Sequence, residues 1–237
     1  AVSGDECFIG DDAHVGPGVK IYPFKTVEAG ATVNSSIIWE SKGARSLFGR
    51  DGISGLANVD ISPELAARVA MAFATTLRKD ATVITSRDSS RAARMLKRAF
   101  MAGLNASGVN VLDLEVAPVP VTRFLTRQPV ATAGVTIRLV EGDSQSVMIR
   151  FFDRDGIDIT EDAQRKIERL IGREDFRRVL AGEIGDIGFP PRALEQYTAA
   201  LGETVDLAAV RKADFKLVID YGYGATAFVM PNVLAKL

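Results

Sequence analysis

The 237-residue chain contains one Cys and one His, and its formal net charge is −1. Its length predicts one large domain or two small ones. A single Cys and a single His exclude a structural zinc site and an intrachain disulfide. The balanced charge offers no basic surface for nucleic acid, and no apolar run approaches the roughly 18 residues of a membrane span. We therefore expect a cytoplasmic protein without nucleic-acid or membrane partners. Any catalysis would depend on carboxylates, hydroxyls, Arg, Lys or a bound ion.

Aliphatic residues recur at every sixth position near the N-terminus, at Ile9, Val15, Ile21, Val27 and Val33. A second, mostly small or apolar series accompanies them, at Ala13, Val19, Lys25, Ala31 and Ile37. A period of six suits neither a helix nor an exposed strand, but it suits a three-sided parallel coil. The pattern resembles the hexapeptide repeat of left-handed β-helices, found in acyltransferases and sugar nucleotidyltransferases. So short a coil needs upstream turns or a second subunit to stack on.

Helix and strand signals alternate from Leu47 onward. Ser62 followed by Pro63 predicts a helix start, because Ser caps the first turn and Pro is favoured at the first helical position. Further helices are expected at 91–104, 160–171, 192–201, 206–211 and 226–237. A short helix is also expected to end at Phe124. Strands are expected at 81–85, 109–114, 131–140, 146–153 and 215–220, with a tight turn at 141–143. This order favours an α/β domain with a mixed, mostly parallel sheet layered with helices.

Several short motifs in this region resemble those of phosphohexomutases, the phosphomannomutases and phosphoglucomutases. They are Phe48–Gly55 before the Ser62 helix start, Ser86-Arg87-Asp88, Ala102-Gly103-Leu104, Pro118-Val119-Pro120 and Arg150-Phe151-Phe152-Asp153. The resemblance implies four segments: a left-handed β-helix at 1–46, mutase domain I at 47–181, a helical connection at 182–213 and the beginning of domain II at 214–237. A hexad coil before this domain further resembles bacterial fusions of a mannose-1-phosphate guanylyltransferase-like domain with a phosphomannomutase-like domain.

The resemblance also implies a phosphoryl-accepting Ser in a Thr-Ala-Ser-His-Asn-Pro loop, before a Gly-Ile-Lys-Phe-Phe strand. Counting back without gaps from Arg150 places Val140 at the position of that Ser and Glu141 at that of the His. Valine has no hydroxyl to accept a phosphoryl group. Ser144 lies nearby but outside the expected register, as does Ser146. We therefore expect no catalytic residue in this chain.

Two other loops depart from the mutase pattern. Ser54 replaces the Arg of a Gly-Ile-Arg-Gly loop, and the Gly-Arg-Asp-x-Arg loop keeps Arg87 but loses its second Arg. The family's metal-binding Asp cluster belongs to the second domain. We therefore expect no metal site and no cofactor in this chain, and Mg²⁺ only in an active parent enzyme.

The remaining ligand candidates are three arginines, Arg50, Arg87 and Arg138, which could hold a phosphate through bidentate contacts. The alternative that we favour is structural pairing with the carboxylates of Asp51, Asp88 or Glu141, respectively. The glycines around Tyr223 could also seat an anion before a helix, although such a short pattern is unspecific.

The sequence leaves three functions open. The first is a catalytically degenerate phosphomannomutase-like region of a sugar-nucleotide biosynthetic enzyme, of the GDP-mannose type, with a structural, oligomerisation or regulatory role. A sugar phosphate is its candidate ligand, and the β-helix is its candidate homo-oligomer interface. The alternative is an active mutase that moves phosphate between C1 and C6 of a hexose. The third is a hexapeptide acyltransferase that uses His14.

Overall fold

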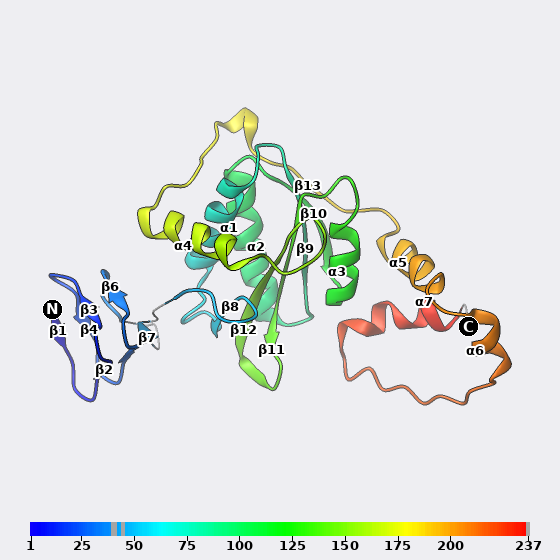
Figure 1. The fold of residues 1–237 in the computed structure, drawn as a ribbon, viewed down its shortest axis with the longest axis horizontal. Helices are drawn as coiled ribbons and strands as arrows, with labels where there is room; N and C mark the ends of the chain where they lie inside the picture. Colours follow the sequence, from blue (N-terminus) through cyan, green and yellow to red (C-terminus); the bar gives the residue numbers. More distant parts are fainter. Residues whose placement is uncertain (39–41, 44–45, 236–237) are drawn as a thin grey trace.

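A six-stranded mixed sheet forms the centre of the α/β region (Figure 1). The computed structural model describes residues 1–38, 42–43 and 46–235. Within them the strand order is β13-β10-β9-β11-β12-β8. The strands are β8 (Ile53–Leu56), β9 (Thr82–Arg87), β10 (Asn110–Val116), β11 (Ala133–Val140), β12 (Asp143–Phe152) and β13 (Ile187–Gly188). The first four strands of that order run parallel, whereas β12 and β8 are antiparallel to their neighbours. The expected mixed, mostly parallel sheet is therefore confirmed.

Helices cover both faces of this sheet. One face carries α1 (Pro63–Thr76), α2 (Arg91–Ala106) and α4 (Glu161–Arg173), and the other carries α3 (Val119–Thr126) (Figure 1). The larger core lies under α1 and α2 and includes Val69, Phe100 and Phe151. The two helices approach closely at Gly103, where an added Cβ would lie 2.4 Å from the carbonyl oxygen of Ala67. This close approach explains why a residue without a side chain stands in the last turn of α2.

The expected helix starts are confirmed. Ser62 accepts a hydrogen bond from the Leu65 N–H, and Ser90 and Thr160 cap α2 and α4 in the same way. Gly108 follows α2 with a φ of 69°, a conformation that suits glycine at a helix end. No helix among the described residues is long and apolar enough to cross a bilayer.

The N-terminal segment consists of two-residue strands, β1 (Val2–Ser3), β2 (Phe8–Ile9), β3 (His14–Val15), β4 (Lys20–Ile21), β5 (Thr26–Val27), β6 (Thr32–Val33) and β7 (Lys42–Gly43). Each of the first three pairs in parallel with a strand 18 residues later, as Val2 does with Lys20. Eighteen residues correspond to three hexads. Val27 and Val33 are buried, whereas Ile9 in the preceding turn is exposed.

The prediction of a strand at 215–220 is wrong. These residues form no regular structure, and Phe215, Leu217 and Val218 are exposed. A strand needs a hydrogen-bonded neighbour, and none of the described residues provides one.

The expected helix at 226–237 is broken into shorter pieces. The structure has a 3₁₀ turn at Ala225–Phe228 and a helix α7 at Met230–Leu234; residues 236–237 lie outside the described residues. Pro231 stands at the start of α7, where its missing N–H costs no helical hydrogen bond. The helices α5 (Ala193–Gly202) and α6 (Leu207–Lys212) lie close to their expected positions.

Three short elements were not anticipated from the sequence. The strand β8 forms within the Gly-rich segment after Phe48, β13 adds an edge strand, and a 3₁₀ turn forms at Ala181–Glu183. All three are too short to show a recognisable periodicity.

Candidate functional site

The expected acceptor loop is a tight β-hairpin. Strands β11 and β12 pair continuously from Gly134 and Phe152 to Leu139 and Val147, and after a bulge Val140 pairs with Asp143. The turn contains only Glu141 and Gly142, and Gly142 has a φ of 77°. The predicted turn is therefore confirmed, and sheet pairing extends through the position that the resemblance assigns to the phosphorylated serine.

The side chains of this hairpin offer no phosphoryl acceptor in the expected register. Val140 has neither a nucleophilic oxygen nor an atom that could ligate a metal, so the position does not fit the Mg²⁺ of an active mutase. Asp143 accepts hydrogen bonds from the backbone of Gln145 and Ser146, at 2.8 and 3.3 Å. Hydrogen bonds from the Ser146 side chain and the Gln145 backbone lower the pKa of Asp143. The tip of the hairpin is therefore anionic at neutral pH.

Two arginines lie beside this hairpin on the face of the sheet that α3 partly covers. Arg150 lies opposite Thr136, and Arg138 is two residues further along β11, so both side chains share one face. Arg138 donates to the Ala117 carbonyl at 3.3 Å, and Arg150 forms an ion pair with Asp158 at 3.0 Å.

Each of these guanidinium groups keeps an unused donor. The Nε atoms of Arg138 and Arg150 are buried and have no partner among the described residues. Burial lowers the pKa of Arg138, Asp88 opposes this shift and Arg150 adds to it. The expected pairing of Arg138 with Glu141 is not observed. The carboxylate whose charge stabilises the Arg138 guanidinium is that of Asp88. Arg138 thus remains a candidate anion ligand, together with Arg150, which the sequence analysis did not single out.

Arg87 faces the opposite side of the sheet and is occupied by structural contacts. It lies opposite Ile137, one residue before Arg138, so the two arginines point to different faces. Arg87 is 7% exposed and forms an ion pair with Glu115 at 3.0 Å. Its bond to Asp88 goes to the backbone carbonyl, at 2.8 Å. Arg87 therefore has structural partners, with Glu115 in place of the expected Asp88 carboxylate, although its buried Nε also has no partner among the described residues.

Glu115 is exposed, and it borders a charge cluster whose other members, Lys97 and Asp113, are buried. The Lys97 ammonium lies 2.5 Å from both carboxylate oxygens of Asp113 and 3.8 Å from Glu115. Burial raises the pKa of Glu115, but the charges of Lys97 and Arg87 outweigh it and the net pKa is lowered. Nothing local in the sequence indicated this cluster, because its members lie on β9, α2 and β10 and meet only in the folded chain.

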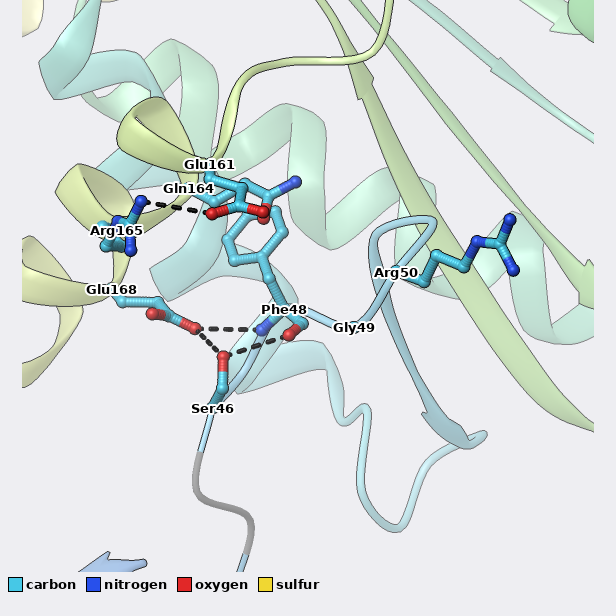
Figure 2. A pocket seen from close by; sticks show the side chains of 8 residues that line it. All are labelled: Ser46, Phe48, Gly49, Arg50, Glu161, Gln164, Arg165 and Glu168. Atoms are coloured by element: carbon cyan, nitrogen blue, oxygen red, sulfur yellow. Dashed lines mark hydrogen bonds and ion pairs between the residues drawn. The ribbon is translucent and has the colours of Figure 1, made fainter.

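Arg50 lines a pocket of about 450 Å³ between the Phe48 loop and α4 (Figure 2). In Figure 2 its side chain extends away from Glu161, Gln164 and Arg165, which lie at the other side of the pocket. Arg50 has no partner among the described residues, so the expected pairing with Asp51 is not observed. The structure therefore does not bring Arg50, Arg87 and Arg138 together into one site.

One carboxylate oxygen in this pocket holds the start of the α/β region in place. Glu168 accepts hydrogen bonds from the Ser46 hydroxyl and from the N–H groups of Leu47 and Phe48, at 2.7, 2.8 and 3.0 Å. Figure 2 shows this carboxylate directed at the loop rather than into the open part of the pocket. Glu168 is therefore a structural residue.

The other candidates gain no support as sites. His14 is exposed on β3, and no group of three or more His, Cys, Asp or Glu side chains in the described part of the chain could hold a metal. Tyr223 is 98% exposed, and a four-residue 3₁₀ turn follows it instead of the helix that an anion seat would need.

Comparison with known proteins identifies relatives of this fold. The family model for phosphoglucomutase/phosphomannomutase, alpha/beta/alpha domain I, matches residues 45–178. A probable phosphoglucosamine mutase of Pyrococcus horikoshii is 37% identical over 191 residues, covering 80% of this chain and 41% of that protein. A phosphoglucomutase/phosphomannomutase of Thermococcus kodakarensis is 30% identical over 195 residues, covering 81% of this chain and 42% of that protein. The chain thus spans about two fifths of the length of these relatives.

A solved structure agrees at the level of the fold. A phosphoglucomutase/phosphomannomutase family protein from Burkholderia thailandensis superimposes with a TM-score of 0.66 at 19% identity, covering 82% of this chain and 42% of that one. The matched segment of the family model contains the whole β9–β12 region and the hairpin. The chain belongs to the phosphoglucomutase/phosphomannomutase family, of which it carries the alpha/beta/alpha domain I.

Proposed function

We propose that this domain binds a sugar phosphate without transferring the phosphoryl group, as a degenerate phosphomannomutase-like region of a sugar-nucleotide biosynthetic enzyme of the GDP-mannose type. One observation carries the proposal: Val140, which stands at the acceptor position that the resemblance implies, lies in the last pairing of the hairpin before a two-residue turn. A phosphoryl group needs an oxygen nucleophile to receive it, and no hydroxyl occupies that position.

The charges around the hairpin are consistent with binding of an anion. The Arg138 and Arg150 guanidinium groups each keep a buried, unpartnered Nε donor, and buried donors without a partner are rare in folded proteins. A phosphate oxygen would satisfy these donors in the geometry that guanidinium groups favour. Glu141 and Asp143 at the tip would repel the same anion, which favours binding along the strands rather than at the turn.

A second candidate function is supported by the family itself. Relatives with names of active mutases match most of this chain, which favours transfer of phosphate between C1 and C6 of a hexose over a non-catalytic role. In that case a hydroxyl outside the expected register, such as Ser144 or Ser146, would have to accept the phosphoryl group.

The two functions predict different outcomes for the complete natural protein given mannose 1-phosphate, a hexose 1,6-bisphosphate activator and Mg²⁺. We expect no mannose 6-phosphate by ³¹P NMR and no phosphorylated Ser by mass spectrometry. Mannose 1-phosphate should still bind, as measured by calorimetry, and Arg138→Gln should weaken binding about tenfold because a charge-assisted bond is lost. Arg94→Gln, on the exposed side of α2, is the matched control. Robust formation of mannose 6-phosphate would establish the active mutase instead.

We also propose that residues 1–46 form a left-handed β-helix that joins a second copy. The 18-residue pairing offset and the burial of Ile21, Val27 and Val33 at six-residue intervals support a three-sided coil. Among the described residues the first turn is open on one side: β1, β2 and β3 each pair with a single strand, and Val2, Phe8 and Ile9 are exposed.

Self-association through this open turn should depend on salt. The turn carries four exposed acidic residues, Asp5, Glu6, Asp11 and Asp12. Two copies of such a turn repel each other, and salt screens the repulsion, so light scattering should show more dimer at higher ionic strength. Ile9→Asp should abolish the dimer, whereas Lys212→Asp, far along the chain, should not. A monomer at every salt concentration would contradict this interface.

A further inference from the structure

A second polar pocket lies at the opposite end of the sheet from the hairpin. This amino-edge pocket has a volume of about 290 Å³ and is lined by Arg78, Pro129, Ala131, Thr132 and Arg154. The strand register places these residues together. Ala133 pairs with Val83 and Gly134 pairs with Phe152, so the segments before β9, before β11 and after β12 meet at one edge. The length of β11, about 25 Å, separates this edge from the hairpin.

The pocket concentrates positive charge without a carboxylate. Arg78 comes from the α1–β9 connection and Arg154 from the loop after β12, and both are exposed. Neither guanidinium has a hydrogen-bond or ion-pair partner in the described part of the chain, and the same holds for the Thr132 hydroxyl. Two like charges that share one pocket repel each other, and a bound anion would remove that cost.

The nearby acidic residues do not neutralise these arginines. Asp153 uses one carboxylate oxygen to accept from the N–H groups of Asp155 and Ile157, at 2.9 and 3.0 Å, which shapes the loop that carries Arg154. Asp80 and Asp155 are neighbours in the sequence but are not among the residues that line the pocket. The Thr132 N–H is also occupied, because it donates to the Thr82 carbonyl at 2.8 Å.

We propose that the amino-edge pocket binds a phosphate group. Arg78 and Arg154 would each donate to two of its oxygens, and the Thr132 hydroxyl would supply a further donor. Planar guanidinium groups match the geometry of phosphate oxygens, and a site formed by two loops and a strand end suits a compact tetrahedral dianion. The group is supplied either by inorganic phosphate or by a phosphorylated metabolite. The site is separate from Arg138 and Arg150 and does not depend on the function proposed for the hairpin.

The 237-residue chain and its Arg78→Gln, Arg154→Gln and Arg138→Gln variants test this site by calorimetry with inorganic phosphate and, separately, with glucose 6-phosphate. We expect Arg78→Gln and Arg154→Gln each to weaken phosphate binding at least tenfold, and Arg94→Gln, on the exposed side of α2, to leave it unchanged. Tighter binding of glucose 6-phosphate than of phosphate identifies a metabolite site, and equal or weaker binding identifies a phosphate site. Backbone amide shifts at Thr132 on titration give an independent localisation.

Two results would overturn the proposal. One is the absence of saturable phosphate binding in the unmodified chain. The other is binding that Arg138→Gln removes and Arg78→Gln does not, which would place the anion at the hairpin. Arg94→Gln serves as the matched surface control, and circular dichroism of each variant verifies that it folds.

Discussion

Replacing Lys97 with Met should lower the free energy of unfolding by about 3–5 kcal/mol, because it leaves the buried Asp113 carboxylate without its cation. The side chains of Lys97 and Asp113 are 3% and 1% exposed, and the ammonium contacts both carboxylate oxygens. After the substitution Asp113 keeps only hydrogen bonds from the Thr85 hydroxyl and the Glu115 N–H, at 3.3 and 2.8 Å. Urea denaturation followed by circular dichroism measures the loss.

A double variant separates the lost pair from lost packing. Lys97→Met combined with Asp113→Leu removes both buried charges and should recover much of the stability, since an apolar pair of similar volume can replace a buried ion pair. Lys79→Met removes an exposed ion pair with Glu183 and should have little effect. A Lys97→Met chain as stable as the unmodified one would show that Asp113 finds water or another partner.

Phe151→Ala should cost about 3–5 kcal/mol, the range for removing a large aromatic side chain from a core. Phe151 is 2% exposed, and its ring packs against those of Phe48, Phe73 and Phe100 at centroid distances of 5.4, 5.1 and 5.9 Å. These contacts join β12 to the Phe48 loop, α1 and α2. The same urea titration measures the effect.

Two comparison variants make this prediction specific. Phe151→Leu keeps most of the apolar volume and should cost less than about 2 kcal/mol. Phe124→Ala, in a half-buried ring that contacts Tyr197, should also cost less than Phe151→Ala because less buried surface is lost. If Phe151→Ala and Phe124→Ala are equally destabilising, the four rings do not form the centre of the core.

The functional proposal depends on a contrast between the fold, which the chain shares with its family, and the hairpin, which departs from the family's motif. The domain matches the family model over residues 45–178 and superimposes on a solved family structure, whereas the hairpin carries Val140 where the resemblance implies a phosphorylated Ser. Strands and helices persist because they bury apolar surface, and this requirement is independent of catalysis. The fold therefore shows the family, and the proposed absence of phosphoryl transfer rests on the residues of the hairpin.

The sequence was most informative where local interactions determine the outcome. The caps at Ser62 and Thr160 and the turn at Gly142 depend on neighbours within four residues, so composition and spacing were enough to locate them. The count from Arg150 to Val140 crosses a hairpin whose two strands pair without an insertion before the bulge.

Other features depend on residues that meet only through folding. Arg87 pairs with Glu115 rather than the Asp88 carboxylate because β9 and β10 lie side by side, 28 residues apart in the chain. The apolar segment at 215–220 has strand propensity, but among the described residues no strand pairs with it and it stays irregular. Propensity and spacing act over a few residues, whereas strand partners, ion pairs between elements and the amino-edge pocket depend on contacts between distant parts of the chain.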